Sequence, residues 1–222
     1  MITLHHLENS RSQRVLWLLE ELGLPFQVQR YQRNPETMLA PPELKRVHPL
    51  GKSPVLVVDG ETLAESGAIV DTLLDLQGNG RLRPPLGSAE RIRYTYWLHF
   101  AEGTAAPFLT MKLVFSKLRS ASVPFFIKPI LKAVAANVDR VFLDPNLLQQ
   151  MLYMESELQT RPWFAGAEFS AADIQMSFPL EAAQARITLS AYPALADWLA
   201  RCQARPAYQR ALEVGGPYSL RS

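Results

Sequence analysis

A stretch rich in glycine and proline, GNGRLRPPLG at residues 78–87, divides this chain of 222 residues into two unlike parts. Such a stretch interrupts regular structure and is typical of a linker. Before it, short β-branched runs alternate with helical patterns, whereas long amphipathic stretches follow it. The sequence therefore predicts an α/β domain over residues 1–77 and an all-α domain over residues 88–222, joined by the linker 78–87.

The first part predicts strands and helices in the order β-α-β-α-β-β-α. Gly23 ends the first helical run, and Asp59-Gly60 is a strong signal for a two-residue hairpin. The first three elements form a βαβ unit, and the hairpin adds antiparallel strands to the same sheet. Strands are expected at residues 2–5, 26–31, 54–58 and 61–63, and the third helix at 65–76.

The second part predicts four or five helices. Ser88 caps a long first helix, in which Pro107 is expected to cause a kink. Pro145 and Pro193 begin two later helices, because proline fits the first turn of a helix. The run Ser170-Ala171-Ala172-Asp173 is similar to a capping box and predicts the start of a buried helix.

Composition and charge exclude several classes of protein. The chain is 48% hydrophobic and 20% charged, as globular proteins are, and its 23 basic and 21 acidic residues give a net charge of +2. This balance favours neither nucleic acid nor an anionic membrane as a partner. The sequence shows neither a signal-like leader nor an apolar run of about 18 residues, so a cytoplasmic protein without a membrane span is expected.

The cysteine and two of the histidines are expected to be structural. Cys202 is the only cysteine, which excludes an internal disulfide and a cysteine-rich site, and no metal is expected. His5 and His6 lie on the first strand, where we expect them to pack or to lie at the sheet edge.

The segment LGKSPVL at residues 50–56 predicts an unusual strand start. Pro54 follows a Gly-Lys turn and begins a strand, a position in which proline is a candidate for a cis peptide bond. A cis bond would turn the backbone N–H and C=O of Ser53 outward. Both groups would then be free to pair with an extended peptide.

The segment LAESGAI at residues 63–69 places Glu65 and Ser66 where a strand runs into a helix. The unpaired N–H groups and the positive end of a helix hold a carboxylate at such a point. The Ser66 hydroxyl adds a donor, and Glu65 accepts from an ammonium group. Together they suit an α-amino acid head group; the alternative is a plain helix N-terminus.

The order of elements and these motifs resemble the glutathione transferase superfamily. LGKSPVL looks like its strand start with a cis-proline, LAESGAI like its Glu/Gln-Ser-x-Ala-Ile motif, and SAADIQMSFPL like its capping-box helix. The segment APPELKRVHPLGKSP is most similar to a fungal and bacterial branch. The resemblance covers nearly the whole chain. It implies a thioredoxin-like N-terminal domain that binds glutathione and an all-α C-terminal domain that shapes a pocket for an electrophile.

The resemblance also implies roles for individual residues. Glu65 and Ser66 would bind the γ-glutamyl group, and the backbone of Ser53, next to Pro54, would pair with the cysteinyl part. Lys52 would reach the glycine carboxylate, or else it is a solvated loop charge. Glutathione is the substrate in this reading, and no cofactor is expected.

The glutathione sulfur needs a hydrogen-bond donor. A thiol with a pKa of about 8.5 is only a few per cent thiolate at pH 7, and lowering its pKa by about 2 units requires about 2.7 kcal/mol. One or two hydrogen bonds to a charged sulfur supply about this much. The turn Asn9-Ser10-Arg11-Ser12, before the first helix, lies where such a donor is needed.

More than one group of this turn can donate the hydrogen bond to the sulfur. The catalytic serine of serine-type members falls on Asn9, one residue before Ser10. We expect the Ser10 hydroxyl to be the donor, with the Asn9 amide or the Arg11 backbone N–H as alternatives. Ser10 and Ser12 are otherwise helix caps. The Arg11 side chain steers the tripeptide or the second substrate, or else is solvated.

The second-substrate pocket is expected between this turn and the first helix of the helical domain. Glu102 on that helix is expected to approach the glutathione of the other subunit in a homodimer, or to be an exposed acid. Tyr218 covers the pocket or lies in a frayed end. Four residues at helical spacing are candidates for the pocket lining, or for the core instead: Phe100, Thr104, Phe108 and Met111.

Two functions follow. The first is conjugation of the glutathione thiolate to hydrophobic electrophiles, as in detoxification, with peroxidase activity toward organic hydroperoxides as a side activity. The second is a non-catalytic binding or interaction protein of the same fold, which the absence of serine at position 9 motivates. Exchange through a protein thiol is disfavoured, because the turn at residues 9–12 contains no cysteine.

Overall fold

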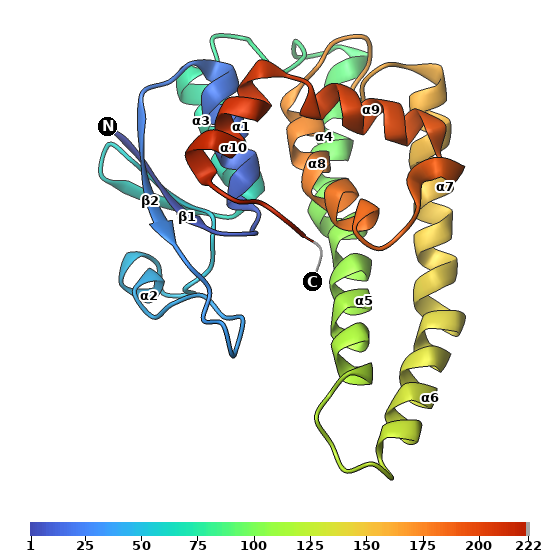
Figure 1. The fold of residues 1–222 in the computed structure, drawn as a ribbon. Helices are drawn as coiled ribbons and strands as arrows, with labels where there is room; N and C mark the ends of the chain where they lie inside the picture. Colours follow the sequence, from blue (N-terminus) through green and yellow to red (C-terminus); the bar gives the residue numbers. More distant parts are fainter. Residues whose placement is uncertain (221–222) are drawn as a thin grey trace.

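One sheet of four strands forms the N-terminal side of the molecule in the computed structural model, which describes residues 1–220 (Figure 1). The strand order is β2-β1-β3-β4. β1 pairs with β2 in parallel and β3 pairs with β4 antiparallel, as the sequence predicts, and β3 joins the sheet antiparallel beside β1. The strands are β1 (Ile2–Leu7), β2 (Phe26–Tyr31), β3 (Val55–Val58) and β4 (Glu61–Ala64).

Local chemistry explains the turn between β3 and β4. Asp59 and Gly60 have φ of 49° and 92°, and a two-residue turn with both central residues at positive φ matches the twist of a hairpin. Asp59 also accepts a hydrogen bond from the N-terminal ammonium of Met1 at 2.5 Å. The predicted hairpin is therefore confirmed.

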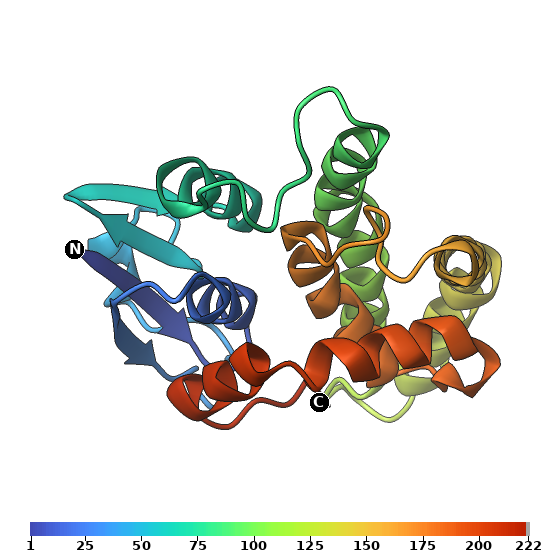
Figure 2. The ribbon, with the colours of Figure 1, turned by 90° about the horizontal axis from the view of Figure 1, so that it is seen from above.

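Two helices lie between the sheet and the helical part of the molecule (Figure 2). They are α1 (Ser12–Leu22) and α3 (Ser66–Gln77), whereas the short α2 (Leu44–Val47) lies apart from them. The residues of α1 from Val15 to Leu19 have no exposed surface. Gly23 ends α1 in the left-handed conformation, at φ 64°.

The helical part begins after residues 78–88, which contain no helix or strand. It has more helices than the four or five predicted, and its long pair α5 and α6 extends well beyond the sheet (Figure 1). Two π-helical turns occur in it, η1 (Ala101–Ala105) and η2 (Asp139–Leu143), each shortly before a proline, and η3 (Leu189–Ala191) is a 3₁₀ turn. The α-helices are α4 (Ala89–Phe100), α5 (Ala106–Arg119), α6 (Lys128–Val138), α7 (Asp144–Thr160), α8 (Ala171–Gln184), α9 (Pro193–Gln203) and α10 (Pro206–Gly215).

Helix α8 is the buried centre of the helical part. The predicted capping box is present: the Ser170 backbone N–H donates to the Asp173 carboxylate at 3.0 Å. The same carboxylate accepts from the Trp198 indole N–H and from the Phe164 backbone N–H, both at 3.0 Å. Asp173 thus joins the start of α8 to α9 and to the loop before α8, although burial raises its pKa.

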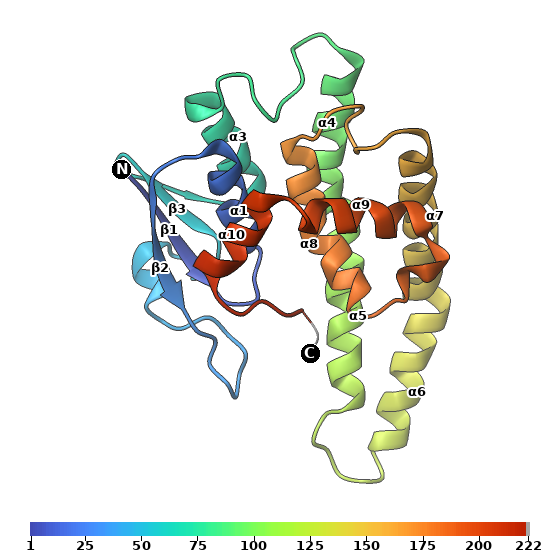
Figure 3. The same cartoon turned by 45° about the horizontal axis from the view of Figure 1, so that its top comes forward.

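Helix α10 returns to the sheet side and packs on α1. Tyr208 meets Trp17 edge to face with ring centroids 5.2 Å apart, and Arg205 pairs with Glu21. The chain then runs back toward α5, between the two halves of the molecule (Figure 3). Within residues 1–220, no helix has both the length and the apolar character needed to cross a bilayer.

Candidate functional site

The loop before β3 presents the backbone of Ser53. The Ser53–Pro54 peptide bond is cis, as the sequence suggests. The Ser53 hydroxyl donates to the His5 carbonyl at 3.1 Å and accepts from the Leu7 N–H at 3.2 Å, which ties the loop to β1. No turn or loop hydrogen bond among the described residues uses the Ser53 backbone N–H or C=O. Lys52 beside it is exposed.

Glu65 and Ser66 lie at the start of α3, as predicted. Glu65 is exposed and has φ of 69°, a strained value for a residue other than glycine. Ser66 is buried, and its hydroxyl accepts a hydrogen bond from the Arg14 guanidinium at 3.1 Å. That hydroxyl therefore keeps its own proton for a ligand. The first N–H groups of α3 lie beside it, which gives this corner donors for a carboxylate.

Arg14 holds this corner together, and sequence reasoning missed it. Its side chain is 1% exposed, donates to the Gln175 carbonyl at 2.7 Å, and pairs with Glu102. Burial lowers the pKa of Arg14, and the Glu102 charge opposes that shift. The signal in the sequence is a lone cation next to a run of apolar residues in α1, because a solvated cation belongs on a polar helix face.

Glu102 lies within reach of two arginines of its own chain. Both of its carboxylate oxygens accept from Arg11 Nε at 3.0 Å, and one also accepts from Arg14. Burial raises the pKa of Glu102, but the Arg14 and Arg11 charges outweigh it and leave the pKa below its ordinary value. Glu102 is thus a half-buried ion-pair partner rather than a fully exposed acid.

The turn before α1 uses its two serines to hold its own shape. The Ser10 hydroxyl is buried, donates to the Leu7 carbonyl at 2.7 Å, and accepts from the Ser12 N–H at 3.2 Å. The Ser12 hydroxyl lies 2.8 Å from Ser10 Oγ and 2.8 Å from His6 Nδ1. These bonds turn the Ser10 hydroxyl toward the protein, where it holds the turn. Neither serine caps α1 with its side chain, because Arg11 is the N-cap residue and α1 has no side-chain cap hydrogen bond.

Asn9 faces the opposite way. It has φ of 50°, a left-handed conformation that asparagine tolerates better than most residues. Its side-chain oxygen accepts from the Ser219 N–H at 2.6 Å, and its backbone carbonyl accepts from Arg33 at 3.2 Å. Asn9 also lines the cavity described next, and its side-chain NH₂ group is a hydrogen-bond donor.

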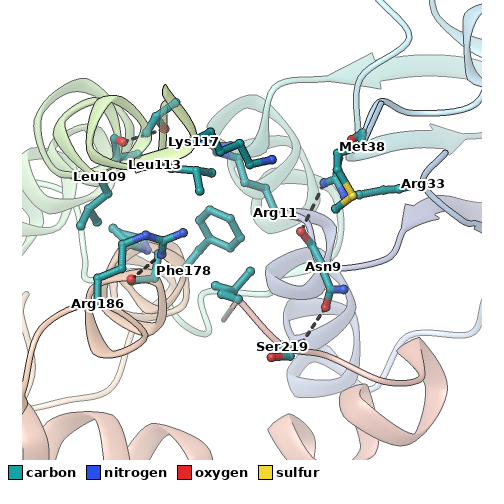
Figure 4. A pocket seen from close by; sticks show the side chains of 15 residues that line it. Asn9, Arg11, Arg33, Met38, Leu109, Leu113, Lys117, Phe178, Arg186 and Ser219 are labelled. Carbon is teal, nitrogen blue, oxygen red and sulfur yellow. Dashed lines mark hydrogen bonds between the residues drawn. The ribbon is translucent and has the colours of Figure 1, made fainter. Parts of the chain in front are cut away.

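A cavity of about 360 Å³ opens between this turn, α5, α8 and the C-terminal segment (Figure 4). The cavity lies where the sequence places the second-substrate pocket, whose role stays a prediction. Its lining differs from the expected one, since Phe100, Thr104, Phe108 and Met111 are all absent from it. The residues that line it are Asn9, Arg11, Arg33, Met38, Ala106, Leu109, Thr110, Leu113, Lys117, Phe178, Pro179, Ala182, Arg186, Ser219 and Leu220.

The π turn η1 explains the difference for Phe108 and Met111, since both follow it along the chain. The Ala106 N–H bonds to the Ala101 carbonyl, five residues back instead of four. Because each α-helical residue turns the chain by about 100°, one extra residue moves every later side chain to another face. Leu109 and Leu113 thereby face the cavity. Phe108 instead packs on Phe142, with ring centroids 5.6 Å apart.

Phe100, just before the π turn, belongs to an aromatic cluster of the core. It is 8% exposed, and its ring centroid lies 4.9 Å from that of Trp97 and 6.0 Å from that of Tyr153. The core alternative for this side chain is therefore confirmed.

The cysteine and the two histidines of β1 are structural, as expected. Cys202 is fully buried, and burial raises the pKa of its thiol. His6 is buried, and its pKa falls to about 4, mainly through burial and also through Arg30. His5 Nδ1 lies 2.8 Å from the Tyr31 hydroxyl.

The C-terminal segment is tied to α8 through Tyr218, which is itself absent from the cavity lining. The Tyr218 and Tyr208 hydroxyls each donate to the buried Glu181 carboxylate, both at 2.6 Å. This pair of bonds fastens the segment to α8. The next residues, Ser219 and Leu220, form part of the cavity wall.

Comparisons with known proteins agree with this architecture. The family model described as glutathione S-transferase, N-terminal domain, matches residues 10–76, and the corresponding C-terminal domain model matches residues 125–206. Glutathione S-transferase 3 of Schizosaccharomyces pombe is 36% identical over 214 residues, which cover 96% of this chain and 87% of that protein.

Solved structures give the same result. A glutathione S-transferase from Actinobacillus pleuropneumoniae is 31% identical, with a TM-score of 0.79, over 99% of this chain and 94% of the other. A sphingomonad glutathione S-transferase complexed with glutathione is 27% identical, with a TM-score of 0.73, over 96% of this chain and 98% of the other. With its thioredoxin-like sheet, its helical second part and these matches along both, the chain belongs to the glutathione S-transferase superfamily and is a glutathione transferase.

Proposed function

We propose that this glutathione transferase joins the glutathione thiolate to a small electrophile held in the cavity beside Asn9 and Arg11. The observation that carries the proposal is the adjacency of two unlike sites. Free backbone groups and a helix N-terminus lie on the sheet side, and a cavity of about 360 Å³ opens next to the turn that precedes α1. A cavity of this size suits a small organic molecule.

The sheet side is the proposed tripeptide site. The Ser66 hydroxyl and the first N–H groups of α3 receive the γ-glutamyl carboxylate, and Glu65 accepts from its ammonium. The backbone N–H and C=O of Ser53 pair with the cysteinyl residue as a short β-strand would. Lys52 is long and exposed, so it reaches the glycine carboxylate. Arg14 orients Ser66 without touching the ligand.

The sulfur then lies near the turn that precedes α1. We propose the Asn9 side-chain NH₂ and the Arg11 backbone N–H as its donors, in place of the Ser10 hydroxyl. The Ser10 hydroxyl donates its hydrogen bond to the Leu7 carbonyl, whereas Asn9 lines the cavity. Each hydrogen bond to the thiolate contributes about 1.5–3 kcal/mol. Two such bonds suffice to hold the sulfur largely as thiolate at pH 7.

The conjugation needs no further group. The thiolate forms a bond to an electrophilic carbon, and the electron pair leaves with a group such as chloride or forms a carbanion that takes a proton from water. Peroxidase activity is the proposed side activity. There the thiolate attacks a hydroperoxide and releases the alcohol, and a second glutathione converts the sulfenic product to the disulfide and water.

We also propose a homodimer. Two large apolar side chains of α4 are exposed in the single chain, Ile92 at 75% and Tyr96 at 47%, and a second copy would cover them. In such a dimer Glu102 would reach the other subunit's glutathione only by giving up part of its pairing with Arg11. Sedimentation velocity at micromolar concentration measures the assembly.

Glutathione titration by calorimetry, together with conjugation of 1-chloro-2,4-dinitrobenzene, tests the proposed function. We expect binding and turnover in the wild type. We expect Ser66→Ala to weaken glutathione binding by about tenfold or more, because a donor to a carboxylate is lost. The control Ser156→Ala, on the exposed surface of α7, should change neither value.

Two results would contradict the proposal. Glutathione binding without turnover favours the non-catalytic alternative. Unchanged binding in Ser66→Ala removes the proposed head-group site.

A further inference from the structure

The polar side of the cavity carries one sign of charge. Four cationic side chains line it, Arg11, Arg33, Lys117 and Arg186, and Figure 4 shows them around a common space. None of the lining residues that the structure describes is aspartate or glutamate. The whole chain carries a net charge of only +2, so this is a local concentration rather than a general excess.

Three of these cations form no ion pair in the described part of the chain, although the Glu8 carboxylate acts on Arg33 through its charge. Within residues 1–220, Arg11 alone of the four forms an ion pair, with Glu102. Arg186 donates to the Ala182 carbonyl at 2.7 Å, and Arg33 donates to the Met38 carbonyl at 3.0 Å. Burial lowers the pKa of Arg186, and no neighbouring acid raises it back. Arg33 and Arg186 are half-buried and Lys117 is exposed, and cations that line a cavity in this way are stabilised when an anion enters it.

Apolar side chains, among them the planar ring of Phe178, also line the cavity. The Phe178 ring lies beneath the Arg11 guanidinium, whose central carbon is 5.0 Å from the ring centroid. Leu109, Leu113 and Pro179 continue the apolar surface. Such a wall accommodates a planar hydrophobic body, while the cations surround its polar end.

The charges of glutathione itself do not account for these cations. Its two carboxylates are placed at the start of α3 and at Lys52 in the proposed site. Lys52, Ser53, Glu65 and Ser66 are all absent from the cavity lining. The cavity cations therefore face the second substrate rather than the tripeptide.

We propose that the second substrate of this transferase is an amphipathic anion, a flat apolar electrophile that carries a carboxylate or a sulfonate. The inference deepens the proposed function and rests on it. With a chloronitrobenzoate, a bond forms between the glutathione sulfur and the ring carbon. The carbon–chlorine bond breaks and chloride leaves with the electron pair, while the carboxylate remains unchanged against the cations.

A matched pair of probes tests this, 4-chloro-3-nitrobenzoate and its uncharged amide, 4-chloro-3-nitrobenzamide. Each kcat/KM is divided by the probe's uncatalysed rate with glutathione, which removes their difference in reactivity. We expect the wild type to favour the benzoate by about tenfold, a charge-assisted contact in a partly open site. Arg186→Gln and Lys117→Gln should each lower this ratio about threefold or more. Lys132→Gln, an exposed cation of α6 outside the cavity, should leave it unchanged.

A second readout separates this inference from the proposed function. Calorimetry with unreactive 3-nitrobenzoate and 3-nitrobenzamide, in the presence of glutathione, measures the charge preference without turnover. Equal affinity for the two, or a ratio that Arg186→Gln and Lys117→Gln leave unchanged, overturns the inference even if conjugation proceeds. Absence of turnover with every probe, while 3-nitrobenzoate still binds preferentially, contradicts conjugation and leaves the anion preference in place.

Discussion

The two sides of the proposed site are built in different ways. The tripeptide side consists of backbone groups and short motifs on the sheet: the cis bond to Pro54 follows Ser53, and Ser66 begins α3. The cavity side consists of side chains from α5, α8 and the C-terminal segment, which lie far apart in the sequence. A short motif therefore specifies the first side, whereas the second depends on how helices are rotated against one another.

This difference predicts different responses to mutation. On the motif side, one substitution should remove a contact with the common substrate, glutathione. On the helical side, a substitution should change which second substrate is accepted and leave glutathione binding intact. Arg14 lies between the two sides, because it contacts Ser66 on one and both Glu102 and Gln175 on the other.

The largest effect is expected for Arg14→Ala. The change leaves Glu102 paired with Arg11 alone, and it leaves the Ser66 hydroxyl and the Gln175 carbonyl without the donor that Arg14 supplies. The free energy of unfolding should therefore fall by about 3–5 kcal/mol. Urea denaturation at pH 7 measures it. The control Arg46→Ala removes an exposed pair with Glu43 and should cost no more than about 0.5 kcal/mol. A loss below about 1 kcal/mol for Arg14→Ala would show that the arginine does not hold the two sides together.

The ion pair between Arg14 and Glu102 also makes the free energy of unfolding depend on pH. The pKa of Glu102 in the folded chain lies below its ordinary value of 4.5. Its ionised form therefore stabilises the fold above that value, and this contribution is lost as the pH falls through the lowered pKa. The stability difference between wild type and Arg14→Ala should narrow in acid. A difference that widens in acid contradicts the pairing.

The next effect concerns the sulfur donor on the motif side. Asn9→Gly removes the amide and keeps the positive φ, so the apparent pKa of the bound glutathione thiol should rise by about one unit and kcat/KM at pH 6.5 should fall about tenfold. The pH profile of kcat/KM measures both. Asn79→Gly, also at positive φ but in the exposed segment 78–88, is the control and should change neither.

Ser10→Ala is the companion variant. It removes turn hydrogen bonds and should cost about 1 kcal/mol of stability without moving the thiol pKa. A raised thiol pKa in Ser10→Ala, with none in Asn9→Gly, would return the donor role to the serine.

The sequence was sufficient for the strands and the hairpin of the sheet, and for the positions of the motifs at Ser53-Pro54 and Glu65-Ser66. Strand and turn signals such as Asp59-Gly60 act over a few residues, and the predicted β2 agrees with the structure at both ends. The cis Ser53–Pro54 bond and the buried capping box at Ser170 were likewise within reach of local patterns. The direction of the Ser10 hydroxyl was not, because it depends on which carbonyl the folded turn offers to that group.

The helical side of the site could not be predicted from local sequence patterns. A π turn changes hydrophobic periodicity only by shifting its phase, which is hard to detect in a sequence. The face of α5 that lines the cavity was therefore predicted as if the helix were regular throughout. Helix α10 was also missed; its Tyr208 packs on Trp17 of α1, and Arg205 just before it pairs with Glu21, although these partners lie far apart in the sequence. Such contacts arise only when the chain has folded back on itself.

The smallest expected effect tests whether the π turn rotates the later side chains of α5 to another face. Leu113 lines the cavity and Met111 does not, although both are half-buried residues on the same helix. Leu113→Ala removes apolar contact with the second substrate and should raise its KM about three- to fivefold, whereas Met111→Ala should change it less than twofold. Neither should alter the KM for glutathione, since both lie on the helical side. A larger effect of Met111→Ala would mean that the unbroken-helix face binds the substrate, and the contrast between a motif-specified side and a helix-rotated side would lose its main support.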